Sequence, residues 1–421
     1  MKLAKIALIL ASLVWVMGLA GCSIKGCSTA VPGSTVGTTG GTGNGSSTTS
    51  GTCTLPGNGS TSSIYGYAVD QAGTVDSYVL NTTANTLAST GVTGPSIPAN
   101  GGGVGMVVAQ GQYLYVVLQL VQQIYGYSIS SSGTLTALNG FPISLSAIGG
   151  IPADGFVQNS VITNPAGTLL FVSSAIDEQI AVYQIGSDGS LTVVNGSPFA
   201  VAGFQPQNLA MDGLGRFLYA SENSSTHAGT MAVAFTVGTG TNAGVLTLAG
   251  TYSAPIFEMR GDPSGNFLIG ISGDTVSQGY TDDDNLYVYS INQTTGALTV
   301  PGTKFATTYA PYNIAMQPTA TNGEFVYSFS LNASGAANPV EAYQISPTTG
   351  VLSAVAGSPF TTLQAAPWGQ FDQSGSYLFY YFGTSPANLG VFNVATSGGL
   401  SQPVTPVALA TAGYWAVADT P

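Results

Sequence analysis

The stretch Asp262-Pro-Ser-Gly-Asn-Phe-Leu-Ile269 contains the pattern that decides the fold. Asp at the start and Gly at the end are typical of a tight turn, because Asp bonds the turn backbone and Gly adopts positive φ. The Phe-Leu-Ile run that follows has the residue types of a buried strand. The same arrangement returns at 164–167, 212–215 and 372–375, each time before an aromatic and aliphatic run. The chain is therefore built from a repeated unit.

A second mark follows each turn by about 30 residues and gives the length of the unit. It is a polar or glycine-rich turn that ends in Leu, at Leu87, Leu135, Leu191, Leu246, Leu298, Leu352 and Leu400. Adjacent leucines lie 48 to 56 residues apart, and a further strand such as Leu286–Tyr289 lies between the two marks. A period near 50 with about four strands per unit indicates an all-β, bladed β-propeller.

Counting the units predicts seven blades. Six complete units of four antiparallel strands run near 103–143, 157–200, 206–253, 255–308, 311–361 and 366–409. Residues 64–90 supply only the second to fourth strands of another blade. We expect residues 413–419 to provide the missing innermost strand, which closes the ring and removes exposed sheet edges.

The composition fits this fold and excludes some functions. Of 421 residues, 44% are hydrophobic and only 6% are charged, with 57 glycines, as expected for many short strands and tight turns. The chain has 6 Lys and Arg against 18 Asp and Glu. A nucleic-acid partner needs basic patches, so it is excluded. A phosphorylated sugar substrate is disfavoured for the same reason.

The N-terminus predicts export and lipid anchoring. A basic start precedes an apolar run of 14 residues, Ile6–Leu19, which is too short to span a membrane. The following Leu19-Ala20-Gly21-Cys22 resembles a bacterial lipobox, in which the peptidase cuts before Cys22 and the Cys is acylated. Residues 1–21 are thus predicted to be a lipoprotein signal peptide; an ordinary secretory signal is the alternative. Ser23 favours the outer membrane, by resemblance to lipoproteins of two-membrane bacteria.

Residues 22–63 are rich in Gly, Ser and Thr and predict a flexible tether. Cys27 and Cys53 lie in it and could pair in an oxidising envelope. The spacing of Cys and His fits no metal site. Residues 64–421 form the predicted propeller.

The repeat resembles the seven-bladed lactonase-like propellers, which include bacterial phosphogluconolactonases and carboxymuconate-lactonising enzymes. The residues that carry the resemblance are the Asp-Pro-x-Gly turn, the Tyr-rich strands and Gly-Ser-Pro-Phe at 196–199 and 357–360. The resemblance covers about 64–421 and implies the propeller fold and lactone chemistry. Its members often have Gly-Pro-Arg-His at the channel mouth. Here the matching stretches are Pro206-Gln-Asn208 and Pro311-Tyr-Asn313, without the Arg-His pair.

Aligning the innermost strands on their turn residues predicts a ring of side chains at one mouth of the central channel. Its candidate ligand-binding members are Asn208, Tyr312, Asn313, Trp368 and Trp415. The aromatic rings could stack on a sugar or another ring, or they could plug the channel.

Four other residues are candidates for chemistry. Glu258 and Arg260 are two apart on one strand, so their side chains should point to the same side. His227, the only histidine, lies with Glu222 in or beside a loop of the neighbouring blade. Together, His227, Glu258 and Arg260 could polarise a lactone carbonyl and activate water, with Glu222 as a ligand contact. The alternative is a structural salt bridge between Glu258 and Arg260 with a solvated His227.

The remaining motifs predict no cofactor-binding site. The acidic loop Asp282-Asp-Asp-Asn285 lacks the spacing of an EF-hand, so we expect a solvated loop and no metal. The sequence shows no dinucleotide or phosphate-binding loop, and we expect no cofactor.

Two hypotheses from different classes remain. The first is a non-catalytic, surface-anchored propeller that binds a small ligand, glycan or partner protein. The second is an envelope lactone hydrolase or lactonising enzyme.

Overall fold

The computed structural model describes residues 63–69, 73–94, 96–98, 104–118, 121–145, 160–175, 177–222, 231–254, 256–272, 284–300, 302–319, 324–330, 339–362, 368–382, 388–402, 404–409 and 414–419. The predictions for the signal peptide, Cys22, Cys27, Cys53 and the tether before Ser63 lie outside these residues. No helix in the described part of the chain is long and apolar enough to cross a membrane.

The strands form seven antiparallel sheets, which we number as blades 1 to 7 from the N-terminus. Blade 1 contains β31 (Tyr414–Asp419), β1 (Ser63–Val69), β2 (Val75–Asn81) and β3 (Thr86–Thr93). Blade 2 contains β4 (Val104–Ala109), β5 (Tyr113–Leu118), β6 (Gln123–Ile129), β7 (Leu135–Ala137) and β8 (Ile143–Ser144). Blade 3 contains β9 (Val161–Thr163), β10 (Leu169–Ser174), β11 (Gln179–Ile185), β12 (Leu191–Val193) and β13 (Phe199–Ala200).

Blade 4 contains β14 (Asn208–Met211), β15 (Phe217–Glu222), β16 (Met231–Val237) and β17 (Leu246–Ser253), with a short 3-10 helix, η2 (Gly240–Asn242), before β17. Blade 5 contains β18 (Glu258–Gly261), β19 (Phe267–Ile271), β20 (Asn285–Ser290) and β21 (Thr303–Ala306). Blade 6 contains β22 (Pro311–Met316), β23 (Glu324–Ser330), β24 (Glu341–Ile345) and β25 (Leu352–Ala354). Blade 7 contains β26 (Trp368–Phe371), β27 (Tyr377–Phe382), β28 (Asn388–Val394), β29 (Leu400–Ser401) and β30 (Val407–Ala408).

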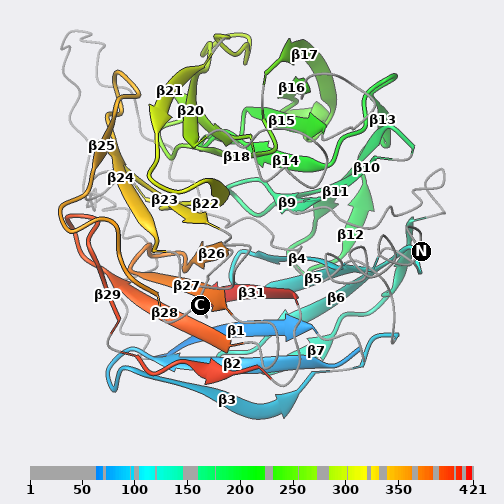
Figure 1. Ribbon diagram of the computed structural model, residues 1–421. Coiled ribbons are helices and arrows are strands. Elements are labelled where there is room, and N and C mark those ends of the chain that lie inside the picture. Colours follow the sequence, from blue (N-terminus) through cyan, green and yellow to red (C-terminus); the bar gives the residue numbers. More distant parts are fainter. Residues whose placement is uncertain are drawn as a thin grey trace, which may run out of the picture.

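The ring closes as the repeat count predicts. The C-terminal strand β31 pairs antiparallel with β1, with Ile64 opposite Asp419 and Val69 opposite Tyr414. Figure 1 shows β31 beside β1, and the first strands of the blades gathered around the centre of the ring. The predicted seven-bladed, all-β propeller with four antiparallel strands per blade is confirmed.

The turn that marks the repeat is held by its first residue. Asp212, Asp262 and Asp372 each accept a hydrogen bond from the backbone N–H five residues later, at 2.7, 2.7 and 2.8 Å. Asn164 accepts the corresponding bond from Leu169 at 2.8 Å. The closing glycine has positive φ in each turn, for example 73° at Gly265. An Asp or Asn side chain therefore replaces backbone partners that the tight turn cannot supply.

The glycine-leucine mark has a role between blades. Tyrosines at one position of the second strands donate a hydrogen bond to the carbonyl oxygen of a glycine in the next blade's mark: Tyr67 to Gly133, Tyr115 to Gly189, Tyr219 to Gly296 and Tyr327 to Gly398, at 2.8 to 2.9 Å. All four rings are fully buried. The hydroxyls thus satisfy backbone oxygens in a place that water does not reach.

The Gly-Ser-Pro-Phe stretches complete the outer part of blades 3 and 6. The Ser197 hydroxyl accepts a hydrogen bond from Val182 N–H at 2.8 Å, and Ser358 accepts one from Ala342 at 2.9 Å. Each serine therefore satisfies a third-strand N–H that the short fourth strand does not reach.

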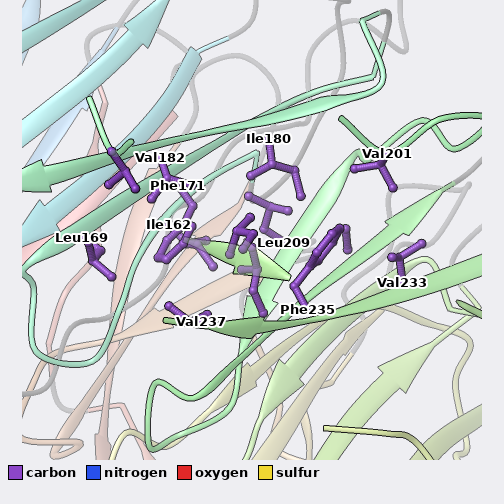
Figure 2. Packing of buried hydrophobic residues seen from close by; sticks show 14 of the residues in the cluster. Ile162, Leu169, Phe171, Ile180, Val182, Val201, Leu209, Val233, Phe235 and Val237 are labelled. Atoms are coloured by element: carbon purple, nitrogen blue, oxygen red, sulfur yellow. The ribbon is translucent and has the colours of Figure 1, made fainter. Parts of the chain in front are cut away.

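The core lies between neighbouring blades, so second strands such as β15 and β23 are buried on both faces. Figure 2 shows the cluster between blades 3 and 4, in which Phe171 and Val182 of blade 3 face Leu209 and Phe235 of blade 4. Similar clusters join the other neighbouring blades. This explains why the strand sequences do not alternate cleanly between apolar and polar residues.

Candidate functional site

The inner strands place one residue from each blade at an equivalent level of the channel. The strand register defines the level: Asn208 lies opposite Ser221, Glu258 opposite Ile271, and Asn313 opposite Phe329. Trp368 has the equivalent place in blade 7, opposite Tyr381. The predicted ring is therefore present in the backbone of blades 4 to 7.

Blades 1 and 2 differ from the predicted alignment by one residue. In blade 2 the turn after β4 is shorter, since Ala109 pairs directly with Tyr113. In blade 1, Trp415 pairs with Ala68, and Tyr414 pairs with Val69. Measured from the buried tyrosines Tyr115 and Tyr67, the equivalent residues are Gly105 and Tyr414. The side chains of Trp368 and Trp415 lie outside the described part of the structure, so their predicted ligand contacts stay predictions.

Glu258 and Arg260 form an ion pair on the inner strand of blade 5. The Arg260 Nη2 atom lies 2.5 Å from Glu258 Oε1, so the two side chains share one side of β18 as the spacing predicts. The Glu258 side chain is completely buried, whereas the Arg260 side chain is 20% exposed. A second guanidinium nitrogen, Nη1, donates to the Met259 carbonyl oxygen at 2.9 Å.

Asn313 completes the environment of Glu258 from the next blade. Its Nδ2 group donates to both carboxylate oxygens of Glu258, at 2.7 and 2.9 Å. Its Oδ1 atom accepts a hydrogen bond from Gly369 N–H of blade 7 at 3.3 Å. One asparagine therefore connects three blades, and charge-assisted donors surround the buried carboxylate of Glu258.

Asn208 makes the corresponding connection between blades 4 and 5. Its Nδ2 group donates to the Phe257 carbonyl oxygen at 2.7 Å, and the Ser221 hydroxyl donates to the same oxygen at 2.8 Å. The Oδ1 atom of Asn208 is buried and has no hydrogen-bond partner among the described residues. It is therefore an acceptor that a ligand hydroxyl could satisfy.

The neighbours of Arg260 are small. The positions equivalent to Arg260 in blades 4 and 6 are Ala210 and Ala315, as the second-strand register shows. A guanidinium between two alanines meets no bulky side chain from these positions. The site combines a firmly held cation with partial exposure, which suits a carboxylate or a carbonyl oxygen of a small molecule.

Three other predicted site residues lie elsewhere or outside the described residues. Tyr312 is in a β-bulge of β22 and is only 6% exposed, in a hydrophobic cluster with Ile64 and Phe379. The buried ring fits a structural plug better than a stacking platform. Glu222 ends β15 and is 1% exposed. His227 lies outside the described part of the chain, as do Asp282 and Asp283 of the acidic loop.

The second arginine of the propeller is structural. Arg216 Nε pairs with Asp212 Oδ2 at 2.9 Å, and its Nη2 donates to the Gly265 carbonyl oxygen of the next blade at 2.9 Å. It therefore fastens the turns of blades 4 and 5 to each other. Sequence reasoning missed the connecting role of Ser221 and the interblade bonds of Asn313, because no short-range pattern indicates which distant residues meet.

The protein is thus a seven-bladed propeller in which an inner strand holds an ion pair between a buried Glu258 and a partly exposed Arg260. Residues 67–247 match the family model described as "Lactonase, 7-bladed beta-propeller". No curated protein sequence matches the chain.

Solved structures show the same fold. A candidate 6-phosphogluconolactonase from Bacteroides fragilis is similar with a TM-score of 0.60 and 16% identity, over 85% of this chain and 99% of that chain. The periplasmic gluconolactonase of Pseudomonas aeruginosa is similar with a TM-score of 0.58 and 14% identity, over 86% of this chain and 100% of that chain. At these identities the likeness concerns the fold alone.

Proposed function

We propose that this chain is an exported, lipid-anchored propeller that binds a small polar ligand through Arg260. The observation that carries the proposal is the contrast within the ion pair: Glu258 is fully buried, while Arg260 is 20% exposed. Glu258 holds the guanidinium in place, and its partial exposure leaves part of it accessible to a ligand. The ligand class is a small molecule with a carboxylate or lactone carbonyl and hydroxyl groups, such as a sugar acid.

Titration calorimetry with a panel of sugar acids and sugar lactones tests the binding. The protein is the full chain without its signal peptide. Arg260→Lys keeps the charge but loses the forked donor, so we expect affinity to fall about 10- to 100-fold. Arg216→Lys, at the opposite end of the inner strands, is the matched control and should bind as the wild type does. Equal affinity in Arg260→Lys and the wild type would exclude Arg260 as the binding group.

Lactone hydrolysis is the second candidate function, favoured by the match of residues 67–247 to the lactonase family model. In this reaction Arg260 would stabilise the oxyanion formed when water attacks the lactone carbonyl. Glu258 already accepts hydrogen bonds from Asn313 and forms an ion pair with Arg260. It would therefore position Arg260 rather than remove a proton from water. His227 is then the candidate base that activates water.

A pH-stat screen with simple, sugar and aromatic lactones separates the two functions. Turnover that is lost in both Arg260→Lys and His227→Ala would support the enzyme. Binding without turnover would support the ligand-binding protein. Turnover that is unchanged in His227→Ala would remove that residue from the mechanism.

The membrane anchor is a separate part of the proposal and is supported by the sequence around Cys22. In a two-membrane bacterium, the wild type should fractionate with the outer membrane and carry acyl groups detectable by mass spectrometry. Cys22→Ser should carry no acyl group. An unacylated wild-type protein would contradict the anchor without affecting the ligand site.

A further inference from the structure

A pair of acidic residues, Asp262 and Glu324, lies at the turn ends of blades 5 and 6. Asp262 begins the turn between β18 and β19 and is fully buried. Its Oδ1 atom accepts a hydrogen bond from Phe267 N–H at 2.7 Å, and its Oδ2 atom accepts one from the Ser264 hydroxyl. Asp262 is thus well supplied with donors and suited to carry a negative charge.

Glu324, the neighbour of Asp262 from blade 6, has few hydrogen-bond donors around its carboxyl group. It is the first residue of β23 and is 2% exposed. Asp262 lies close enough to raise the pKa of the Glu324 carboxyl group, and the hydroxyl and backbone N–H of Ser264 lie close enough to lower it in part. Nevertheless, neither carboxyl oxygen of Glu324 receives a hydrogen bond of normal geometry within the described residues. An ionised carboxylate without well-aligned donors is costly to bury, particularly beside a second carboxylate.

Protonation of Glu324 removes both the need for donors and the repulsion between two negative charges. A protonated carboxyl group needs no donor and can itself donate to Asp262. We propose that Asp262 and Glu324 share one proton, which Glu324 holds, and that this proton joins blades 5 and 6. Burial and the negative charge of Asp262 raise the pKa of Glu324 to about 7, in agreement with this arrangement. Burial also raises the pKa of Asp262, against the lowering effect of Ser264 and Phe267.

The turns on either side of the pair contain further charged groups, among them Asp372 of blade 7, whose pKa burial raises to about 6. From blade 4, Arg216 bonds Asp212 and the Gly265 carbonyl oxygen. From blade 7, Gly375 of the Asp372 turn receives a hydrogen bond from the uncharged Gln317 at 2.9 Å. Residues 320–323, which precede Glu324, are Ala, Thr, Asn and Gly and cannot ionise.

The consequence is a stability that depends on pH near neutrality. The pKa of Glu324 is higher in the folded protein than in the unfolded chain, so folding retains the proton. Its contribution is therefore complete below pH 4.5, the ordinary pKa of a Glu carboxyl group, and is lost as pH rises from there to about 7. Over this range, the equilibrium constant for unfolding should increase by up to about tenfold per pH unit.

Glu324→Gln provides the direct test, because the amide keeps the shape and the donor but cannot ionise. Thermal unfolding of the full chain without its signal peptide is followed from pH 5 to 9 for the wild type and the variant. We expect the difference in melting temperature between them to grow in favour of Glu324→Gln as pH rises from 5 to about 7, and to stay constant above that pH. A difference that is already constant between pH 5 and about 7 would overturn the proposal.

Asp262→Asn is the matched second variant, since Asn164 already forms the equivalent turn in blade 3. Removing the negative charge lowers the pKa of Glu324, so the pH dependence should move to lower pH. A divalent cation is the competing occupant of two buried carboxylates. If calcium raises the melting temperature of the wild type at pH 8 and leaves Glu324→Gln unchanged, the pair binds a cation and the shared proton is wrong.

Discussion

Blades 5 and 6 meet at buried carboxylates near both ends of their inner strands, and the two ends neutralise them differently. At one end, Glu258 has an arginine and an asparagine as partners. At the other end, Glu324 lies beside Asp262, and neither carboxyl group forms an ion pair within the described residues. A guanidinium stays charged at every pH at which the protein folds, whereas a shared proton is lost near neutrality. The partner of a buried carboxylate thus decides which condition breaks the contact.

Removing the guanidinium of Arg260 should cause the largest loss of stability. Arg260→Leu leaves Glu258 as an unpaired charge with no exposure to water, and we expect a loss of about 3–5 kcal/mol in the free energy of unfolding. Chemical denaturation measures the effect. The double variant Glu258→Gln/Arg260→Leu removes both charges and should recover much of the loss. A double variant no more stable than the single one would show that the unpaired charge is not the cause.

Removing the amide should have a smaller effect at the same end. Asn313→Ala deletes two hydrogen bonds to Glu258 but leaves the ion pair, so we expect a loss of about 1.5–3 kcal/mol in the free energy of unfolding. Asn313→Gln is the control for the amide chemistry, because it keeps the donors on a longer side chain. If the denaturant midpoints of Asn313→Ala and the wild type coincide, the hydrogen bonds from Asn313 of blade 6 do not stabilise buried Glu258.

Close backbone packing between blades 4 and 5 also contributes to stability at the turn end. A Cβ atom added to Gly261 would collide with the backbone carbonyl oxygen of Met211 in blade 4. Gly261→Ala should therefore destabilise the protein by about 1–3 kcal/mol, measured by denaturation. Gly399→Ala is the control, since its Cβ would meet only the Ser397 hydroxyl oxygen at an ordinary 3.7 Å. Equal stability of both variants would mean that blades 4 and 5 can separate at this point.

The sequence predicts the fold well because the repeat is local. The Asp262-Pro-Ser-Gly turn and its relatives place strands on both sides within a few residues, and the leucine marks give the number of blades. The closing strand follows from the one incomplete unit. The single-residue shift in blade 2 was not predictable, because Ala109 and Tyr113 form a shorter turn without the Asp or Asn that marks the others.

The candidate site is predicted less completely, because its contacts cross between blades. The spacing of Glu258 and Arg260 on one strand indicates their shared side, and their ion pair confirms it. The bonds from Asn313 to Glu258 join residues that are 55 positions apart, and nothing in the sequence indicates them. Glu324 escaped notice because its turn departs from the repeated motif: Gln317 stands where the other turns have Asp or Asn.

Closure of the ring by β31 also sets an order of events in time. Strands β1, β2 and β3 are made first, but their blade lacks an inner strand until the last part of the propeller has been made. During synthesis, blade 1 therefore stays incomplete while the six other blades can already form. The final pairing joins the two ends of the domain, a contact of maximal sequence separation whose formation is slow. Until then, the inner edge of β1 has unpaired backbone groups, which another extended chain can pair with.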